Sequence, residues 1–413
     1  MDPCQDLKFV FFLDTEIVVM ALHQPQGSRL LGVQDPVIPQ VQAWVREHPG
    51  TISLGQGIVA YGPPAIALDV LSRFGQDPSD HRYGPVGGDP ELRAMLESKL
   101  AADNGIILGS GQSLLVTAGS NMAFFETILA MTSPGDEVLL PTPFYFNHEM
   151  AIGMLGCKAV PVPSGEGYAL DLLALEKAIT PRTRAIVTVS PNNPTGCVYS
   201  EASLRAVNRL CAERGLYHLS DEAYEYFVWG DTPHFSPAAI SGAEAHTVGF
   251  YSLSKTLGLA GWRIGYMVVP RALESSLVKI QDTNLICPPR PSQAAAVAAL
   301  REGRRYFEQA AAPLQGLRSD VLESLATLGQ FLLEPPRSEG AFYVFLNVAT
   351  TLKSMVLAER LAREHGVAVV PGEAFGIQQG CYLRVAYGAP DPDTVREGVR
   401  RLIRGIRAIL ERP

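Results

Sequence analysis

One lysine stands in a short segment of small and apolar residues, a setting in which a lysine can do chemistry. Residues 251–265 read YSLSKTLGLAGWRIG and contain two cations, Lys255 and Arg263. Burial and a neighbouring cation both lower the pKa of a lysine, which then offers a nucleophilic amine. The planar fork of an arginine matches two oxygens of a phosphate. The segment therefore predicts a covalent anchor beside an anion clamp.

Further polar groups stand where other predicted strands end. AGSN at 118–121 opens a predicted helix, and the N-H groups of a helix start attract phosphate. Asn193 lies in PNNPTG, and Asp221 and Tyr224 lie in SDEAY. Taken singly, each motif is typical of a turn or a helix cap. Together with Lys255 they are what an aldehyde cofactor with a phosphate tail and a basic ring nitrogen requires, and that cofactor is pyridoxal 5'-phosphate.

Short apolar runs alternate with helical patterns from about residue 65 to 300 and predict the elements that position these groups. One helical pattern, SEASLRAVNRLCAERG, has Ser200 as its expected N-cap and Gly215 as its C-cap. The alternation is typical of a mostly parallel sheet between helices, which binds ligands beyond the carboxyl ends of its strands. The predicted strands are 114–117, 137–141, 158–162, 185–190, 216–220, 247–252 and 264–269.

The last third of the chain has a different pattern and predicts a second, smaller α+β domain. A long helical stretch at about 304–328 precedes three predicted strands and a closing helix; the strands are 342–348, 367–371 and 381–387. The expected fold class is α/β, with a large cofactor-binding domain whose mostly parallel mixed sheet lies between helices. The expected boundaries are 1–29 for an N-terminal extension, 65–303 for the large domain, and 30–64 with 304–413 for the small one.

Composition excludes several classes of protein. The formal net charge of -8 argues against nucleic acid as a partner, because nucleic-acid-binding proteins usually carry a basic patch. The six cysteines lack CxxC spacing and predict free thiols in a reducing cytoplasm and no metal site. No apolar stretch reaches the roughly 18 residues that span a bilayer. The first residues lack the features of a signal peptide, and Met20 is an alternative start.

Several motifs in order resemble those of the fold-type I, class I/II aminotransferases. SLSKTLGLAGWRIG is similar to the lysine signature of that family, PNNPTG to its asparagine-proline loop and SDEAY to its aspartate-to-tyrosine pair. LGQG, YGPVGGDPELR, PGDEVLLPTPFY, PGEAFG and YLRVAYG also match in order, so that the resemblance covers roughly residues 30–410. It implies a pyridoxal-phosphate-dependent transaminase that moves an amino group from an L-amino acid to a 2-oxo acid, with 2-oxoglutarate as the expected acceptor, by a ping-pong route.

The resemblance assigns catalytic roles to three side chains and a binding role to a fourth, Asn193. Lys255 would bind the cofactor aldehyde and move a proton between the substrate α-carbon and C4' of the cofactor. Asp221 would pair with the ring nitrogen and keep it protonated. Tyr224 and Asn193 would hydrogen-bond the phenolic oxygen, and Asn193 would also lie beside the substrate.

The cofactor phosphate has its own expected set of residues. Ser252 and Arg263 would hold it, together with the backbone at Gly119, Ser120 and Asn121.

Four more residues follow from the resemblance. Tyr145, rather than its neighbour Phe144, would stack on the cofactor ring, and Tyr83 would reach the phosphate of a second subunit, which implies a homodimer with shared active sites. Arg384 would grip the substrate α-carboxylate, and Gly57 would let the backbone approach the same group.

Two segments depart from the commonest pattern of the family. IVAYGPP follows LGQG, so that Ile58 and Tyr61 are expected to line a reshaped and rather apolar substrate pocket. NLICPPRPSQ carries Cys287 and Arg290. Arg290 has two open interpretations: a ligand for a distal substrate carboxylate, or a surface arginine between two prolines.

Two other functions remain open at this point. The same site would serve β-elimination, as in the cysteine-sulfur lyases that share these motifs. A non-catalytic cofactor-binding effector domain of a transcription regulator would need a DNA-binding module, for which the roughly 30 residues before the first family motif are too few.

Overall fold

The computed structural model describes residues 9–13, 16–20 and 29–411. Its centre is a seven-stranded sheet in the order β4-β10-β9-β8-β7-β5-β6. The strands pair in parallel from β6 to β9, and β10 runs antiparallel to both of its neighbours. Their bounds are β4 Gln112–Thr117, β5 Glu137–Thr142, β6 Lys158–Pro163, β7 Thr183–Val189, β8 Tyr217–Asp221, β9 Thr247–Ser252 and β10 Gly265–Pro270. All seven predicted strands are therefore confirmed, within a few residues at their ends.

Helices cover both faces of this sheet, because alternate residues of each strand point to opposite sides. In β4, Leu115 packs with helices α4, α5 and α9, whereas Leu114 and Val116 pack with α2, α3 and the first half of α10. Helices α6 and α7 lie on the same side as α3, over β5 to β7. The bounds are α2 Ala65–Leu71, α3 Pro90–Lys99, α4 Ser120–Met131, α5 Phe146–Met154, α6 Leu172–Ala178, α7 Glu201–Arg214, α8 Leu253–Thr256 and α9 Arg271–Asn284.

Helix α7 has the ends that the sequence predicts. The Ser200 side chain accepts a hydrogen bond from the backbone N-H of Ser203, and Gly215 closes the helix in the left-handed conformation. Both caps satisfy backbone groups that a helix end leaves free.

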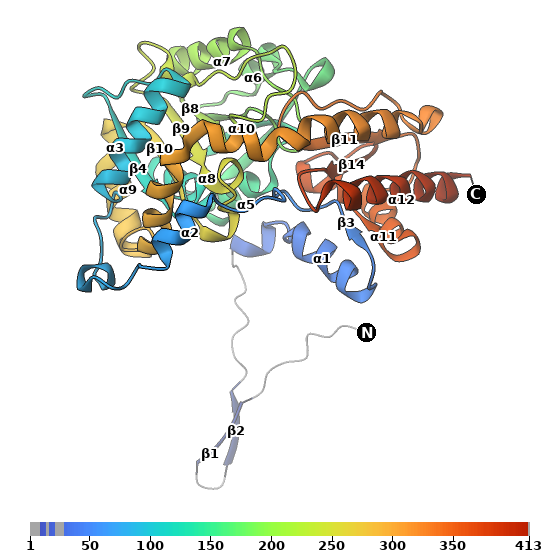
Figure 1. Ribbon diagram of the computed structural model, residues 1–413, viewed down its shortest axis with the longest axis horizontal. Helices are drawn as coiled ribbons and strands as arrows, with labels where there is room; N and C mark the ends of the chain where they lie inside the picture. The colour runs from blue at the N-terminus through green and yellow to red at the C-terminus, as the bar shows by residue number, and fades with distance from the viewer. Residues whose placement is uncertain (1–8, 14–15, 21–28, 412–413) are drawn as a thin grey trace.

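A smaller layered unit lies beside the large sheet (Figure 1). Its antiparallel sheet has the order β11-β14-β13, and the short strand β12 pairs in parallel with β3. Helices α1, α11 and α12 pack on these strands around one hydrophobic core. The bounds are α1 Val37–Glu47, β3 Ile52–Ser53, β11 Tyr343–Val348, α11 Ser354–His365, β12 Val367–Ala368, β13 Val370–Pro371, β14 Cys381–Ala386 and α12 Pro392–Leu410.

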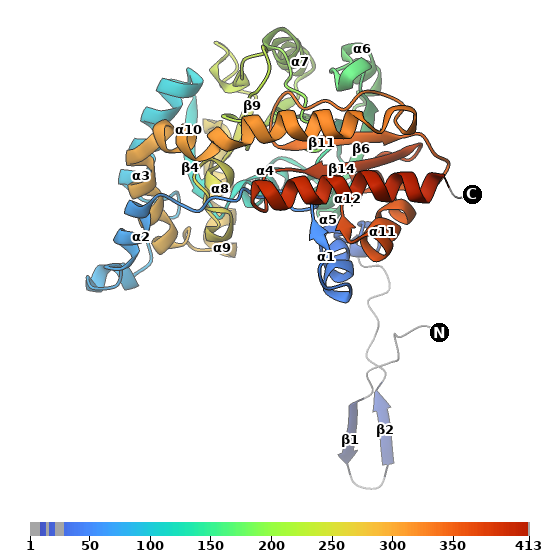
Figure 2. The same cartoon turned by 45° about the vertical axis from the view of Figure 1, so that its right-hand side comes forward.

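One long helix, α10 at Arg290–Ala326, connects the two units, as both ribbon views show (Figures 1 and 2). Gly303 interrupts it with φ 54° and ψ -143°. The helical stretch thus begins earlier than the predicted residue 304, because Pro289 and Pro291 favour a helix start at Arg290. The break at Gly303 coincides with the predicted domain boundary.

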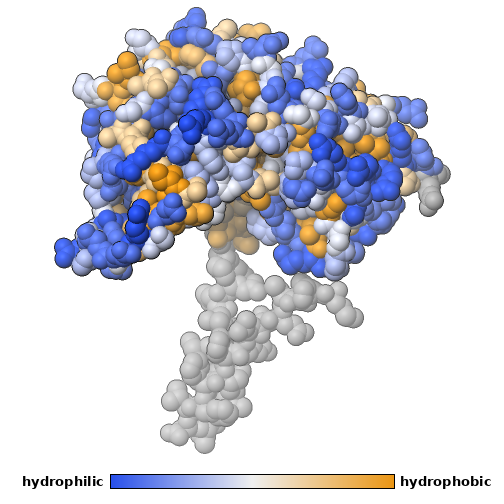
Figure 3. Space-filling view, viewed as in Figure 1, coloured by the Kyte–Doolittle hydropathy of each residue, from blue (hydrophilic) through white to orange (hydrophobic). Residues whose placement is uncertain are grey.

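The N-terminal segment contains a hairpin of β1 Phe9–Leu13 and β2 Glu16–Met20. The alternative start at Met20 concerns residues that lie mostly outside the described part of the chain. The face in Figure 3 is mainly hydrophilic, with smaller hydrophobic patches between. None of the helices in the described residues combines the length and the apolar character that crossing a bilayer requires.

Candidate active site

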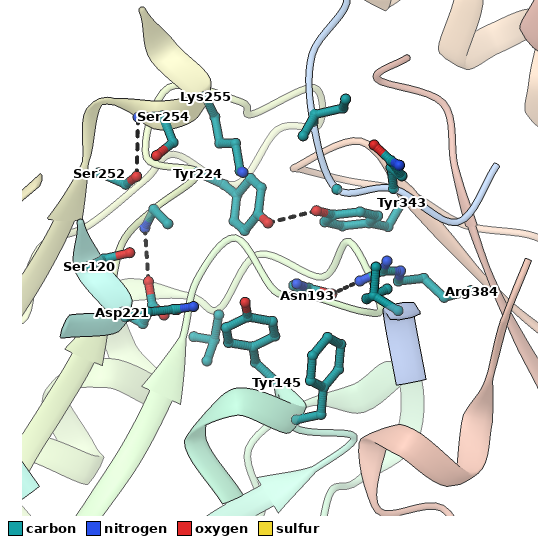
Figure 4. Close-up of a pocket in the computed structure, with 18 of the residues that line it drawn as sticks. Ser120, Tyr145, Asn193, Asp221, Tyr224, Ser252, Ser254, Lys255, Tyr343 and Arg384 are labelled. Atoms are coloured by element: carbon teal, nitrogen blue, oxygen red, sulfur yellow. Dashed lines mark hydrogen bonds between the residues drawn. The ribbon is translucent and has the colours of Figure 1, made fainter. Parts of the chain in front are cut away.

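A pocket of about 320 Å³ lies where strands of the large sheet end and the smaller unit begins. Its walls come from the segments that follow β4, β5, β7, β8 and β9, which are the strand ends singled out in the sequence (Figure 4). The predicted site residues that line it are Gly57, Ser120, Asn121, Tyr145, Asn193, Asp221, Tyr224, Ser252, Lys255, Arg263 and Arg384. The fold thus brings together residues from positions 57 to 384.

Lys255 points into this pocket from the single turn of α8 (Figure 4). The Ser252 hydroxyl caps that turn by accepting a hydrogen bond from the N-H of Ser254 at 3.2 Å. Burial, followed by the neighbouring cations Arg263 and Arg384, lowers the pKa of Lys255 to about 8, whereas Asp221 acts in the opposite direction. About one tenth of the lysine is therefore the neutral, nucleophilic amine at pH 7, far more than for a lysine with its ordinary pKa.

This pKa predicts how the cofactor-free protein captures an aldehyde. The rate of covalent capture of pyridoxal 5'-phosphate should rise between pH 7 and 9 with a midpoint near 8, because only the neutral amine attacks. The rate at pH 7 should be roughly one tenth of the plateau, as expected one pH unit below a pKa. Stopped-flow absorbance checks this prediction. A midpoint near 10.5, the ordinary value of a lysine, would contradict the described environment.

Asp221 ends β8 and is held from two sides. Its Oδ1 accepts a hydrogen bond from the N-H of Ala223 at 3.1 Å, and its Oδ2 lies 3.1 Å from Nε2 of His148. His148 is buried on α5, with its ring stacked on Phe124 at 4.0 Å between centroids. This pairing orients the carboxylate toward the pocket, where it can meet a protonated ring nitrogen.

Two tyrosine hydroxyls form a hydrogen bond in the wall of the pocket. The oxygens of Tyr224 and Tyr343 lie 2.6 Å apart, and both side chains are buried (Figure 4). Burial, followed by the proximity of Tyr343, raises the pKa of Tyr224 well above its ordinary value. Tyr224 is therefore protonated and can donate a hydrogen bond to an anionic oxygen in the pocket.

Arg384 is a buried cation that has no carboxylate partner among the residues that the structure describes. It is 2% exposed, and its guanidinium donates to Asn193 Oδ1 at 2.9 Å and to the carbonyl of Gly55 at 2.6 Å. The guanidinium lies over the face of the Tyr343 ring, with Cζ 4.7 Å from the ring centroid. Its Nε has no hydrogen-bond partner among the described residues. A buried guanidinium is costly unless an anion pairs with it. The arrangement fits a carboxylate ligand, which accepts two parallel hydrogen bonds from arginine.

The phosphate cradle combines a helix start with an arginine. Gly119 caps α4 with φ 88°, and a Cβ at that position would collide with the guanidinium of Arg263. Arg263 donates to the carbonyls of Ala260 at 3.0 Å and Ala118 at 3.3 Å, which fixes it beside the helix start. Only glycine lets the cation approach this closely. The N-H groups of α4 and the guanidinium then face the same space.

Tyr145 and Phe144 have different places. Tyr145 lines the pocket and stands edge-on to His148 at 5.2 Å between centroids. Phe144 is buried away from it, and a Cβ on Gly376 would collide with its ring. The structure thus brings the preferred candidate to the pocket and uses its neighbour for packing.

These groups fit pyridoxal 5'-phosphate. The set contains a lysine with a lowered pKa, a carboxylate backed by histidine, a phenol donor and a cradle that a Cβ would fill. The bound cofactor supplies an aldehyde for exchange of amines and a ring that accepts electrons. Its aldehyde, ring nitrogen, phenolic oxygen and phosphate would each have a partner among these groups.

Ile58 and Tyr61 were both expected to line the substrate pocket, but only Ile58 does so. Ile58 lines it and is 37% exposed at its mouth. The Tyr61 side chain instead donates from its hydroxyl to the backbone carbonyl of Lys255 at 2.8 Å and stands edge-on to Tyr306. Tyr61 is not among the residues that line the pocket, and it braces the lysine turn from outside.

Tyr83 and Arg290 lie outside the pocket of this chain. The Tyr83 side chain is 77% exposed. Arg290 donates to the carbonyls of Ser79 at 3.1 Å and Arg82 at 3.4 Å, and its guanidinium lies 4.0 Å from Asp80. Within one chain, these contacts favour a structural role for Arg290 in the loop that carries Tyr83.

Several residues of the site were not predicted from the sequence, among them His148, Tyr343, Ile38 and Phe146. His148 had a weak signal, because it stands three positions after Tyr145 in the segment that follows a predicted strand. Tyr343 stands in the apolar run FYVFLNV, where nothing marks its hydroxyl as functional. Ile38 and Phe146 line the pocket as apolar residues, which periodicity alone assigns to a core.

Comparisons with known proteins agree with this chemistry. The sequence family described as aminotransferase class I and II matches residues 49–402. An aromatic aminotransferase of Arabidopsis thaliana is 34% identical over 393 residues, which cover 93% of this chain and 97% of that protein. An aspartate aminotransferase of Pyrococcus abyssi is 33% identical and covers 86% of this chain and 92% of its own length.

The fold is also that of solved aminotransferases. The aspartate aminotransferase of Thermus thermophilus, solved with maleate, has a TM-score of 0.84 and 31% identity over 91% of this chain and 98% of that one. The expected fold class is therefore confirmed, and the relatives favour amino-group transfer over β-elimination or a non-catalytic effector domain. The chain belongs to the class I and II aminotransferases and is a pyridoxal-phosphate-dependent transaminase.

Proposed function

We propose that this transaminase takes its amino group from amino acids with apolar side chains and passes it to a 2-oxo acid by a ping-pong route. The observation that carries the proposal is the surroundings of Arg384. The pocket that holds this cation is also lined by the large apolar side chains of Ile38, Ile58 and Phe146. The α-carboxylate would lie on Arg384 and Asn193, and the side chain would face these three residues.

Charge supports an apolar rather than an acidic side chain. Among the described residues that line the pocket, the only basic side chains are those of Lys255, Arg263 and Arg384, which already have roles. The carboxylate of aspartate would be buried without a cation, which costs several kcal/mol before relaxation. The longer chain of 2-oxoglutarate, the expected acceptor, can place its distal carboxylate at the exposed mouth beside Ile58.

The proton and the cofactor would be handled by four side chains. Lys255 is proposed to move the proton between the substrate α-carbon and C4' of the cofactor, as the neutral amine that its lowered pKa makes available. Asp221, held by His148, would keep the ring nitrogen protonated. Tyr224 would donate to the phenolic oxygen of the cofactor.

The phosphate and the ring of the cofactor would be held by the other predicted residues. Ser252, Arg263 and the α4 start at Gly119, Ser120 and Asn121 are proposed to bind the phosphate, with Tyr145 stacked on the ring. Gly57 is proposed to let the backbone approach the substrate carboxylate, and it also lets Tyr343 approach, because a Cβ there would collide with the Tyr343 hydroxyl.

We also propose a homodimer in the cytoplasm with shared active sites. Support comes from Tyr83, a large aromatic side chain that is 77% exposed and is absent from the pocket of its own chain. The proposed domains keep the predicted boundaries at 30–64 with 304–413 and at 65–303. The backbone break at Gly303 supports the second of these boundaries.

The substrate proposal predicts a ranking of amino donors. With a fixed 2-oxo acid, kcat/KM for phenylalanine or leucine should exceed that for aspartate by about tenfold or more, equivalent to about 1.4 kcal/mol. Initial rates across a panel of donors measure this ranking. Ile58→Arg should raise kcat/KM for aspartate and lower it for phenylalanine, because it adds a cation at the apolar end. Aspartate as the best donor of the unmodified protein would contradict the proposal.

A further inference from the structure

A second cavity lies behind the lysine turn, and the proposed reaction does not use it. Its volume is about 470 Å³, larger than that of the active-site pocket. Apolar side chains form much of its wall, including Met95, Leu253, Leu257 and Leu300. The exposed residues Ser98 and Arg304 stand at its rim and leave it open to solvent. We call it the rear cavity; its volume is in the range of small-molecule sites.

The rear cavity shares one wall with the active site. On the turn of α8, Ser254 and Lys255 line the active-site pocket, whereas Leu253 and Thr256 line the rear cavity. Leu257, the next residue, also faces the rear cavity. A ligand in the rear cavity would therefore pack directly against the backbone that carries the catalytic lysine.

The segment after β8 separates the two spaces in the same way. Ala223 and Tyr224 line the active-site pocket, and the following Glu225 and Tyr226 line the rear cavity. In both segments, consecutive residues face different cavities. A single stretch of chain therefore separates the active-site pocket from the rear cavity at Lys255 and at Tyr224.

Most charged groups of the rear cavity form ion pairs. Lys99 lies 2.5 Å from Glu225, and this carboxylate also accepts from Asn104 at 2.7 Å. The hydroxyl of Tyr226 donates to Asp103 at 2.5 Å. An anionic ligand would find no unpaired cation among the described residues of this wall, because Lys99 pairs with Glu225 and Arg304 with Glu308. Asp103 has no ion pair, but it is exposed, and solvent screening makes its attraction for a cation weak. The mainly apolar wall therefore favours an uncharged ligand.

One polar group of the wall has no partner. The Oγ1 hydroxyl of Thr256 is buried without a hydrogen bond, and the residue is 5% exposed. A buried hydroxyl that lacks a partner destabilises the folded protein. Rotation of this side chain about χ1 would turn the hydroxyl toward the cavity, where a ligand with a single donor or acceptor would satisfy it.

We infer that the rear cavity is a binding site for an uncharged, mainly apolar small molecule that carries one hydrogen-bonding group. The apolar body would lie against Met95, Leu257 and Leu300, and the polar group would meet the hydroxyl of Thr256. Such a ligand would hold the α8 turn from behind and so act on the position of Lys255 without entering the active site.

Binding of 4-ethylphenol to the holoenzyme tests this inference, because the probe has an apolar ring and one hydroxyl. Calorimetry should show one site per chain with a Kd below ~1 mM. Leu300→Trp, which fills the cavity, should weaken binding at least tenfold, and Thr256→Val, which keeps the shape without the hydroxyl, about three- to tenfold. Leu173→Trp, the matched substitution at an exposed leucine of α6, should leave binding unchanged.

Hydrogen exchange locates the bound probe independently of activity. The probe should slow amide exchange in peptides that cover residues 251–258 and 95–104, and Leu300→Trp should remove this protection. Failure to bind, equal binding to Leu300→Trp, or protection confined to the segments around Ser120 and Arg384 would overturn the inference. These results leave amino-group transfer untouched, so the two proposals fail separately.

Discussion

Replacing Lys255 with alanine is expected to abolish turnover while the protein remains folded. The lysine is the only residue placed to bind the cofactor aldehyde and to move the substrate proton, among the described residues that line the pocket. General acid-base catalysis by a positioned side chain contributes about 10² to 10⁴, and loss of the covalent anchor adds to it. We expect kcat to fall by more than about 10⁴ and the visible absorbance of the anchored cofactor to disappear.

The fold should survive this change because Lys255 is not a stabilising residue. Its pKa is lowered to about 8 by burial and by Arg263 and Arg384, so the folded protein holds the charged form at a cost. Circular dichroism should therefore be unchanged. Lys353→Ala, at an exposed position before α11, is the matched control and should retain full activity. Retained turnover in Lys255→Ala would refute the assignment.

Replacing Arg384 with methionine is expected to lower kcat/KM for both half-reactions by about 10² to 10³. Amino donor and 2-oxo acid each carry a carboxylate beside the reacting carbon, so one cation serves both. Truncating one partner of a buried, hydrogen-bonded charge pair costs 2 to 5 kcal/mol or more. Steady-state kinetics with each substrate varied in turn measures the loss, which should be of similar size for the two.

Two comparisons separate this role from a general packing defect. Arg384→Lys keeps the charge but loses the planar fork, so its loss should lie between those of the wild type and Arg384→Met. An amine that lacks the carboxylate should react equally slowly with wild type and Arg384→Met. If kcat of Arg384→Met for that amine were lower than kcat of the wild type, Arg384 would act on the structure of the site rather than on the carboxylate.

The site residues that stand at the end of a strand of the large sheet could be predicted from the sequence. Asn193, Asp221 and Lys255 follow three neighbouring parallel strands, and the carboxyl ends of such strands must meet at one edge of the sheet. Glycine spacing marked the cradle, because Gly119 and the segment around Arg263 allow close approach of the backbone. The types of these residues and their strand positions were sufficient to name the cofactor.

Residues that act through tertiary contacts could not be predicted in this way. Tyr343 reaches Tyr224 across 119 positions of sequence, and only the docking of β11 beside the large sheet brings the two hydroxyls together. Tyr61 was expected to line the pocket, but its hydroxyl donates a hydrogen bond to the carbonyl of Lys255 instead. The roles of all these residues in the reaction stay predictions until they are tested by substitution.

The most direct test of the account is a single half-reaction of the holoenzyme with an L-amino acid and no second substrate. Transamination predicts one equivalent of 2-oxo acid per active site, no ammonia, and an amino group that remains on the enzyme until a 2-oxo acid is added. With phenylalanine, the product should be phenylpyruvate at this stoichiometry. Continuous release of ammonia together with a 2-oxo acid, beyond one equivalent and without any acceptor, would contradict it.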